Sequence, residues 1–98
     1  MTTVRLLPKA ECDIMEAVEW YDAEREALGV QFEEYVTSTL DRIRENPSLF
    51  PVHHQGARRA LVDTFPYGVL FVESAGEVLV VAFLHLHRDP NIWKSRQR

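Results

Sequence analysis

The stretch EVLVVAFLHL, residues 77–86, decides the fold because it is the most apolar segment of the chain. Valine, leucine and phenylalanine side chains fit a pleated sheet, so the stretch predicts a β-strand. Apolar residues occupy both alternations, which would place Leu79, Val81 and Phe83 on one side and Val80, Ala82 and Leu84 on the other. A strand that is apolar on both faces is expected at the centre of a sheet and covered on both sides.

Two more strands are predicted ahead of this one. VLFVE, residues 69–73, is joined to it by a short turn that contains Gly76, which is a hairpin signal. RRALVDTF, residues 58–65, precedes the hairpin and completes a three-stranded antiparallel meander. The segment PSLFPVHHQG, residues 47–56, reads as a loop because prolines and a glycine punctuate it.

The first half of the chain predicts a short strand, VRLL at residues 4–7, and then two helices. Pro8 suits a first helical turn, and the spacing of the apolar residues indicates one amphipathic face: Ile14, Ala17, Val18, Tyr21 and Leu28. Gly29 is expected to be the C-cap of this helix. A second helix carries Phe32, Val36, Leu40 and Ile43 on one stripe and ends at Asn46-Pro47. The expected fold is therefore α+β: one domain over residues 1–98, with an N-terminal strand, an antiparallel helical hairpin and the meander in one sheet.

Composition limits the classes of function. The chain has 98 residues with 46% hydrophobic and 27% charged side chains, and its only cysteine is Cys12. No secretory signal stands at the start and the longest apolar run has seven residues (78–84), so we expect a cytoplasmic protein without membrane contact. Residues 1–50 hold five basic and eleven acidic side chains, and residues 51–98 hold six and four, so an anionic partner should meet the second half.

The segment HLHRDPNIWKSRQR, residues 85–98, follows the central strand and raises the question of function. If alternation persists, the strand delivers His85 and His87 to one side and Arg88 to the other, with Trp93 folding back to one functional rim. Four interpretations compete. They are a metal site with His53 and His54, acid–base chemistry on a phosphodiester with Arg59, a protein-binding surface, and a structural role. The metal site is the weakest of these because no zinc-type ligand spacing occurs.

Arg58-Arg59, Arg88 and the basic residues near the end of the chain could also form a patch for RNA, with aromatic residues close to it in sequence. The net charge of −4 argues against strong nonspecific binding to nucleic acid.

Four segments together resemble the RelE/ParE superfamily of toxins from bacterial type II toxin–antitoxin modules, also called plasmid-stabilisation proteins. They are AECDIMEAVEWYDAE, LDRIRENPSLFP, the basic pair before FPYGVLF, and AFLHLHRDPNIW. The resemblance runs from about residue 4 to residue 96. It implies a helical hairpin packed on an antiparallel sheet, a cognate antitoxin as partner, and no cofactor or metal.

The candidate target-binding residues are Arg58, Arg59, Tyr67, His85, His87, Arg88 and Trp93, and the resemblance implies Arg59, Arg88 and Trp93 among them. ParE-like members are linked to poisoning of DNA gyrase, whereas RelE-like members cut mRNA in the ribosome. In a nuclease the candidate catalytic residues would be Arg59, His85, His87 and Arg88.

Two departures favour the ParE-like branch. The family commonly has arginine directly after the tyrosine of FPY, and this chain has Gly68; Trp93 stands near where nuclease members tend to have a tyrosine. A glycine cannot hold a scissile phosphate, and an indole cannot exchange a proton as a phenol can. The sequence therefore favours a gyrase-binding toxin, with a ribosome-dependent endoribonuclease or an inactive family member as alternatives.

Overall fold

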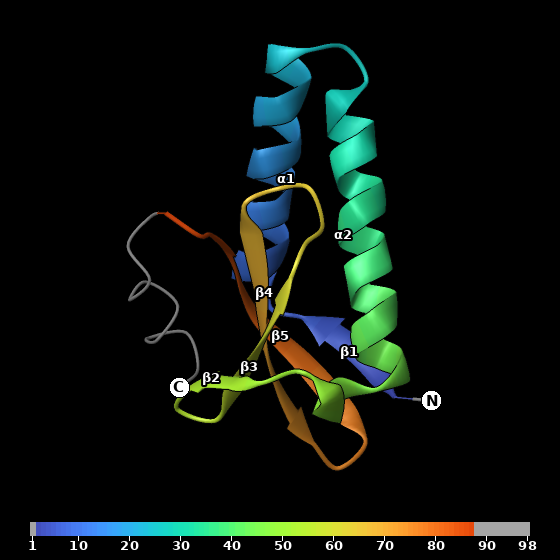
Figure 1. The fold of residues 1–98 in the computed structure, drawn as a ribbon, viewed down its shortest axis with the longest axis vertical. Helices are drawn as coiled ribbons and strands as arrows, with labels where there is room; N and C mark the ends of the chain where they lie inside the picture. Colours follow the sequence, from blue (N-terminus) through green and yellow to red (C-terminus); the bar gives the residue numbers. More distant parts are fainter. Residues whose placement is uncertain (1, 88–98) are drawn as a thin grey trace.

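The computed structural model describes residues 2–87, which run from an N-terminal strand through a helical hairpin into the sheet (Figure 1). The elements are β1 (Thr3–Leu6), α1 (Pro8–Glu24), α2 (Leu28–Glu45), the 3-10 helix η1 (Pro47–Leu49), β2 (Val52–His54), β3 (Ala57–Leu61), β4 (Tyr67–Ser74) and β5 (Glu77–His85). The predicted α+β class and the order of strand, two helices and meander are confirmed. None of the helices in the described part is long and apolar enough to cross a membrane.

All five strands form one sheet in the order β1-β5-β4-β3-β2. β5 lies in the interior between β1 and β4, as its apolar sequence predicted. β1 pairs with β5 in parallel, from Thr3 opposite Glu77 to Leu6 opposite Val80, and the other neighbours are antiparallel. A parallel pair needs a long crossover, and residues 7–76, which include the helical hairpin and strands β2 to β4, form it here.

The prediction of a loop over residues 47–56 was wrong in part. This segment contains η1 and the edge strand β2, which pairs with β3 across a turn at Gln55 and Gly56. Both turn residues have positive φ, 49° and 80°, the conformation that tight hairpin turns require. The predicted strand 58–65 is shorter than expected, because β3 ends at Leu61 and Thr64 has a φ of 75°.

The prediction that Gly29 is the C-cap of the first helix is wrong. α1 ends at Glu24, and Gly29 lies in the first turn of α2. Its N–H donates to Oδ1 of Asp22 at 2.9 Å. Ala27, the residue before α2, has no side-chain cap, so Asp22 on α1 satisfies one of the free N–H groups at the start of α2. The glycine permits this close approach, since a Cβ at position 29 would stand 2.3 Å from the same Oδ1.

The predicted alternation along β5 is also wrong after Val80. Leu70 pairs with Ala82 but Phe71 pairs with Val80, so Val81 is the extra residue of a β-bulge. The bulge puts Val81 and Ala82 on the same face, and Phe83 joins Val80 on the opposite face.

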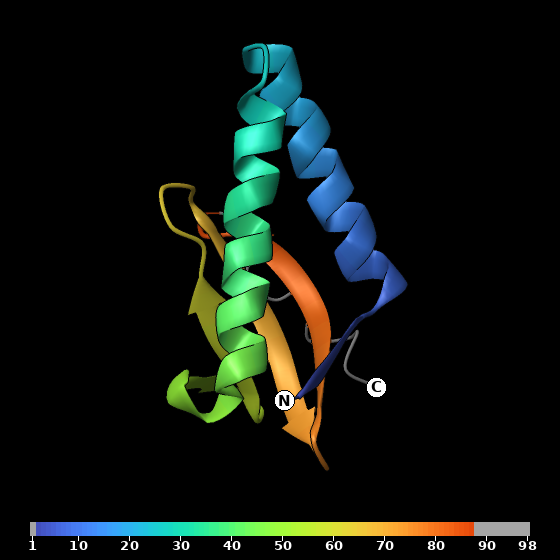
Figure 2. The same cartoon turned by 90° about the vertical axis from the view of Figure 1, so that its right-hand side faces the viewer.

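The helices pack against one face of the sheet, and the tip of the hairpin projects beyond the ends of the strands (Figures 1 and 2). The main core lies between helices and sheet, and its largest fully buried side chains include Phe32, Ile43 and Phe71. The amphipathic faces predicted for both helices are confirmed by Ala17 and Val36, which are buried there, but Leu28, predicted on the first helix, is the first residue of α2.

A second, smaller cluster lies on the other side of the sheet, which we call the helix-free face because neither α1 nor α2 covers it. Its buried members are Ala57, Leu70, Val81 and Ala82, with Leu7, Val72, Leu79 and Leu84 packed against them. No residue of α1 or α2 belongs to this cluster.

Candidate functional site

The end of the β4–β5 ladder brings three candidate residues together. Tyr67 pairs with His85 in the sheet register, and their ring centroids lie 5.1 Å apart at 79°. Tyr67 also stacks on Phe83 at 4.8 Å and is only 7% exposed. The sequence predicted Tyr67 as a target-binding residue. In the structure Tyr67 is almost wholly buried, and its ring packs against the imidazole of His85.

His85 and His87 lie side by side, as predicted, with ring centroids 5.6 Å apart. The backbone N–H of His87 donates to Nδ1 of His85 at 3.2 Å, which requires an unprotonated Nδ1. β5 ends at His85, and Leu86 stays attached to the loop before β4 because its N–H donates to the carbonyl of Pro66 at 2.8 Å. The half-buried His85 is therefore held in place, and His87 is exposed beside it.

The basic pair Arg58-Arg59 does not act as a unit, because neighbouring residues of β3 point to opposite faces. Arg58 is on the helix side, where Nη1 donates to the carbonyl oxygens of Phe50 at 2.5 Å and Ser48 at 3.4 Å. These hydrogen bonds attach the segment between α2 and β2 to strand β3. Arg58 is thus a structural residue in the described part of the chain.

Arg59 is on the helix-free face, in the same alternation as the buried Ala57. A Cβ added to Gly68 would meet Cγ and Cδ of Arg59 at 3.3 Å, so the aliphatic stem of Arg59 lies across the glycine. Within residues 2–87 the guanidinium of Arg59 has no hydrogen bond or ion pair. The resemblance implied an arginine at position 68. The glycine found there instead leaves the space in which the aliphatic stem of Arg59 lies.

Several predicted residues do not join this site or cannot be placed. Arg88 and Trp93 lie outside the described residues, so the predicted rim of His85, Arg88 and Trp93 stays a prediction. His53 is on β2, the edge strand separated from β5 by β3 and β4. Among the described residues, no three His, Cys, Asp or Glu side chains are grouped to hold a metal ion.

Sequence reasoning missed two exposed leucines near Gly68. Leu61 is 48% exposed and pairs with Gly68 in the sheet, and Leu86 is 41% exposed with Cδ2 3.4 Å from the position of a Cβ on Gly68. Both lie in segments that were predicted as strands, and the sequence analysis assigned neither of them a role. Strand alternation places Leu61 on the same face as Ala57 and Arg59, and this spacing was the available signal for its position.

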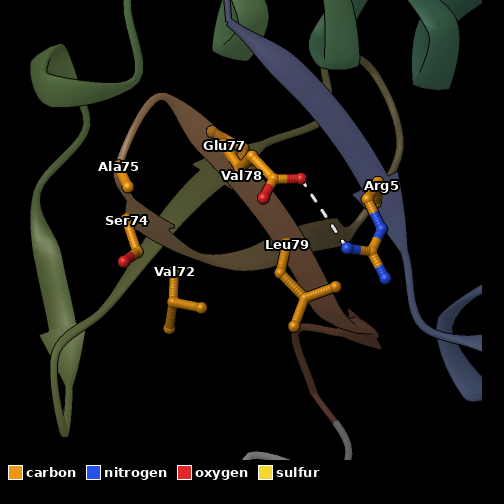
Figure 3. Close-up of a pocket in the computed structure, with 7 residues that line it drawn as sticks. All are labelled: Arg5, Val72, Ser74, Ala75, Glu77, Val78 and Leu79. Atoms are coloured by element: carbon orange, nitrogen blue, oxygen red, sulfur yellow. Dashed lines mark ion pairs between the residues drawn. The ribbon is translucent and has the colours of Figure 1, made fainter.

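A hollow of about 260 Å³ lies at the opposite end of β5, beside the β4–β5 turn (Figure 3). Arg5 and Glu77 line it and form an ion pair at 3.6 Å, with their side chains 68% and 55% exposed. An ion pair this exposed contributes well under about 1 kcal/mol. The hollow is partly open, and its only hydroxyl, that of Ser74, has no imidazole beside it to act as a base, so we do not assign it a function.

Comparison with known proteins identifies the fold. No protein-family model matches the chain, and no curated protein does. Among solved structures, a chain of the "Chromosomal ParDE TA system from P. aeruginosa" matches with a TM-score of 0.79 and 12% sequence identity. The match covers 89% of this chain and 98% of that one. This chain has a ParE-like fold. The resemblance read from the sequence is therefore confirmed at the level of the fold.

Proposed function

We propose that this chain is the toxin of a type II toxin–antitoxin module, that a cognate antitoxin neutralises it, and that it acts in the cytoplasm by binding DNA gyrase. The supporting observation is the match to the ParDE chain, which spans almost the whole length of both proteins at a TM-score of 0.79. The sequence identity of 12% makes the shared architecture, and not shared side chains, the basis of the proposal.

The residues around Gly68 favour binding over phosphodiester cleavage. Cleavage of RNA needs several cations converging on one phosphate, together with a proton carrier. In the described residues the basic pair is divided between the two faces of β3, and Gly68 supplies no charge. A single guanidinium, that of Arg59, remains available on the helix-free face.

The test is controlled expression of the chain in a bacterium, followed by supercoiling assays with purified gyrase. Expression should arrest growth, co-expression of a small protein encoded beside the gene should restore it, and purified toxin should inhibit supercoiling. Growth arrest with unaffected gyrase would reject gyrase as the target. A folded chain that leaves growth unchanged would reject the toxin proposal and identify an inactive member.

A second candidate is a ribosome-dependent mRNA endoribonuclease, which the paired imidazoles favour. The ring centroids of His85 and His87 lie 5.6 Å apart, close enough for one imidazole to bind a phosphate and the other to transfer a proton. Arg59 and Arg88 would then bind the phosphate. Primer extension on translated mRNA after induction separates the candidates: discrete cuts that vanish in His87→Ala and Arg88→Ala would establish the nuclease and reject the binding mechanism.

A further inference from the structure

A row of leucines on the helix-free face is interrupted by Gly68. Leu61 of β3 and Leu84 of β5 are the two sheet neighbours of Gly68, so the three residues form one cross-strand row. Leucine, glycine and leucine leave a gap at the middle of the row, because glycine has no side chain. Leu86 borders the same gap. We call these four residues together with Arg59 the Arg59 surface.

The gap fixes where the charge of Arg59 is presented. Its Cγ and Cδ occupy the space above Gly68, with apolar side chains around them. A guanidinium on a stem that is packed in this way keeps its charge at one place and loses less rotamer freedom on binding. The side chain is half-buried, which strengthens its attraction for an opposite charge relative to one in bulk water.

The other arginines of β1, β3 and α2 already have partners in the described structure. Arg5 pairs with Glu77 and Arg44 with Asp41, while Arg58 and Arg42 donate to backbone carbonyls. Arg59 differs from them because no described group forms an ion pair or hydrogen bond with its guanidinium. Its surroundings also differ from those of Arg25, which is fully on the surface at the end of α1.

We propose that the Arg59 surface is a docking site for a protein segment that presents a carboxylate between apolar side chains, and that Gly68 is the positioning residue that holds Arg59 ready for it. A carboxylate fits the planar guanidinium through two parallel hydrogen bonds. The exposed leucines, Leu61 and Leu86, supply the flanking apolar contacts. The inference rests on the proposed function only for the existence of a protein partner.

The side chains favour a peptide over RNA. Single-stranded RNA is bound through several cations and through aromatic rings on which the bases stack. The Arg59 surface has leucines and one cation, and the ring contacts around Tyr67 lie on the helix side. The net charge of −4 further weakens attraction for a polyanion.

The experiment uses the full chain and a short probe peptide in which leucine and glutamate alternate, with a leucine–lysine peptide as its counterpart. NMR titration follows the Nε–Hε signal of Arg59 and the amide signals of Leu61, Gly68 and Leu86. The glutamate peptide should shift all four signals, the lysine peptide should shift none, and binding should weaken with salt. Arg59→Gln should reduce affinity roughly tenfold, the value of one charge-assisted contact. Arg25→Gln, which changes the net charge equally, should leave affinity unaltered.

Gly68→Val tests the positioning role, because its side chain would displace the stem of Arg59. Affinity should fall about as much as in Arg59→Gln, and the double variant should be no weaker than either single one, since both act through one guanidinium. If Gly68→Val unfolds the protein, Gly68→Ala, whose Cβ would lie 3.3 Å from the stem, should still move the Nε–Hε signal of Arg59.

Equal binding by the glutamate and lysine peptides, or unchanged affinity in Arg59→Gln, would overturn the docking site. Unchanged affinity in both Gly68 variants would overturn the positioning role. Tighter binding of a single-stranded RNA at the same signals would replace the peptide with a nucleic acid. These results are independent of growth arrest, so a failure here and a failure of the proposed function can be told apart.

Discussion

Replacing Gly29 with alanine should destabilise this protein, although glycine to alanine inside a helix ordinarily stabilises. The added Cβ would lie 2.3 Å from Oδ1 and 2.4 Å from Cγ of Asp22, so the carboxylate must swing away. The chain then loses the 2.9 Å bond that caps α2. Loss of such a cap costs about 2 kcal/mol at the upper end. The gain in helix propensity offsets about 1 kcal/mol of this cost.

We therefore expect a net loss of about 1 kcal/mol in the free energy of unfolding, or a fall in Tm of roughly 4–8 °C for a domain of this size. Urea denaturation and thermal unfolding measure both values. The decisive comparison is with Asp22→Ala. In that background there is no carboxylate to displace, so Gly29→Ala should stabilise by about 0.5–1 kcal/mol.

Ser38→Ala, on the exposed side of α2, is the control for helix propensity and should stabilise slightly in both backgrounds. If Gly29→Ala stabilises the native chain as much as it stabilises Asp22→Ala, the assignment of Asp22 as the cap of α2 is wrong.

Three further predictions concern stability and are checked by urea denaturation. Arg58→Met should cost about 1–2 kcal/mol, because it removes the bonds to the carbonyls of Phe50 and Ser48, whereas Arg59→Met should change stability by less than about 0.5 kcal/mol; equal losses would contradict the division of the pair. Ala27→Gly should stabilise by up to about 1 kcal/mol, since Ala27 has a φ of 66° where glycine has no Cβ penalty; a loss would show that the hairpin turn does not need this conformation. Glu77→Gln should cost less than about 0.5 kcal/mol because its pair with Arg5 is exposed, and a larger cost would show that the hollow in Figure 3 is more than an open surface.

The class and order of the elements could be predicted because helices and strands have different apolar periods. The bulge in β5 could not. Register is encoded by a contrast between polar and apolar residues, and Leu79, Val81, Ala82 and Leu84 are all apolar. A slip by one residue therefore leaves the hydrophobic pattern unchanged. Only the pairing with β4 reveals it.

Gly29 was misread for a different reason. A glycine after a helical pattern usually ends the helix, and no sequence rule relates it to an aspartate seven residues earlier. The placement of Arg58 and Arg59 on opposite faces of the sheet, in contrast, could have been predicted from strand alternation alone. Adjacent basic residues were interpreted as a patch, but adjacent residues of a strand point to opposite faces.

The candidate site was predicted in part. His85 and His87 were expected together and are together, since they follow one strand. Tyr67 was predicted to bind the target, but it is buried by contacts with Phe83 and with Phe32 of α2, which lie far from it in the sequence. The contact between the stem of Arg59 and Gly68 joins two strands. Predicting it would have required the register of β3 and β4.

The parallel pairing of β1 with β5 has a consequence for how the molecule is assembled. Thr3 and Glu77 are partners although almost the whole described chain separates them, so this contact closes the longest loop in the sheet and should form late. Until β1 docks, the most apolar strand has one open edge, which another newly made copy could pair with. Shortening the chain before Pro8 would make that intermediate permanent, and self-association would then compete with native folding during synthesis.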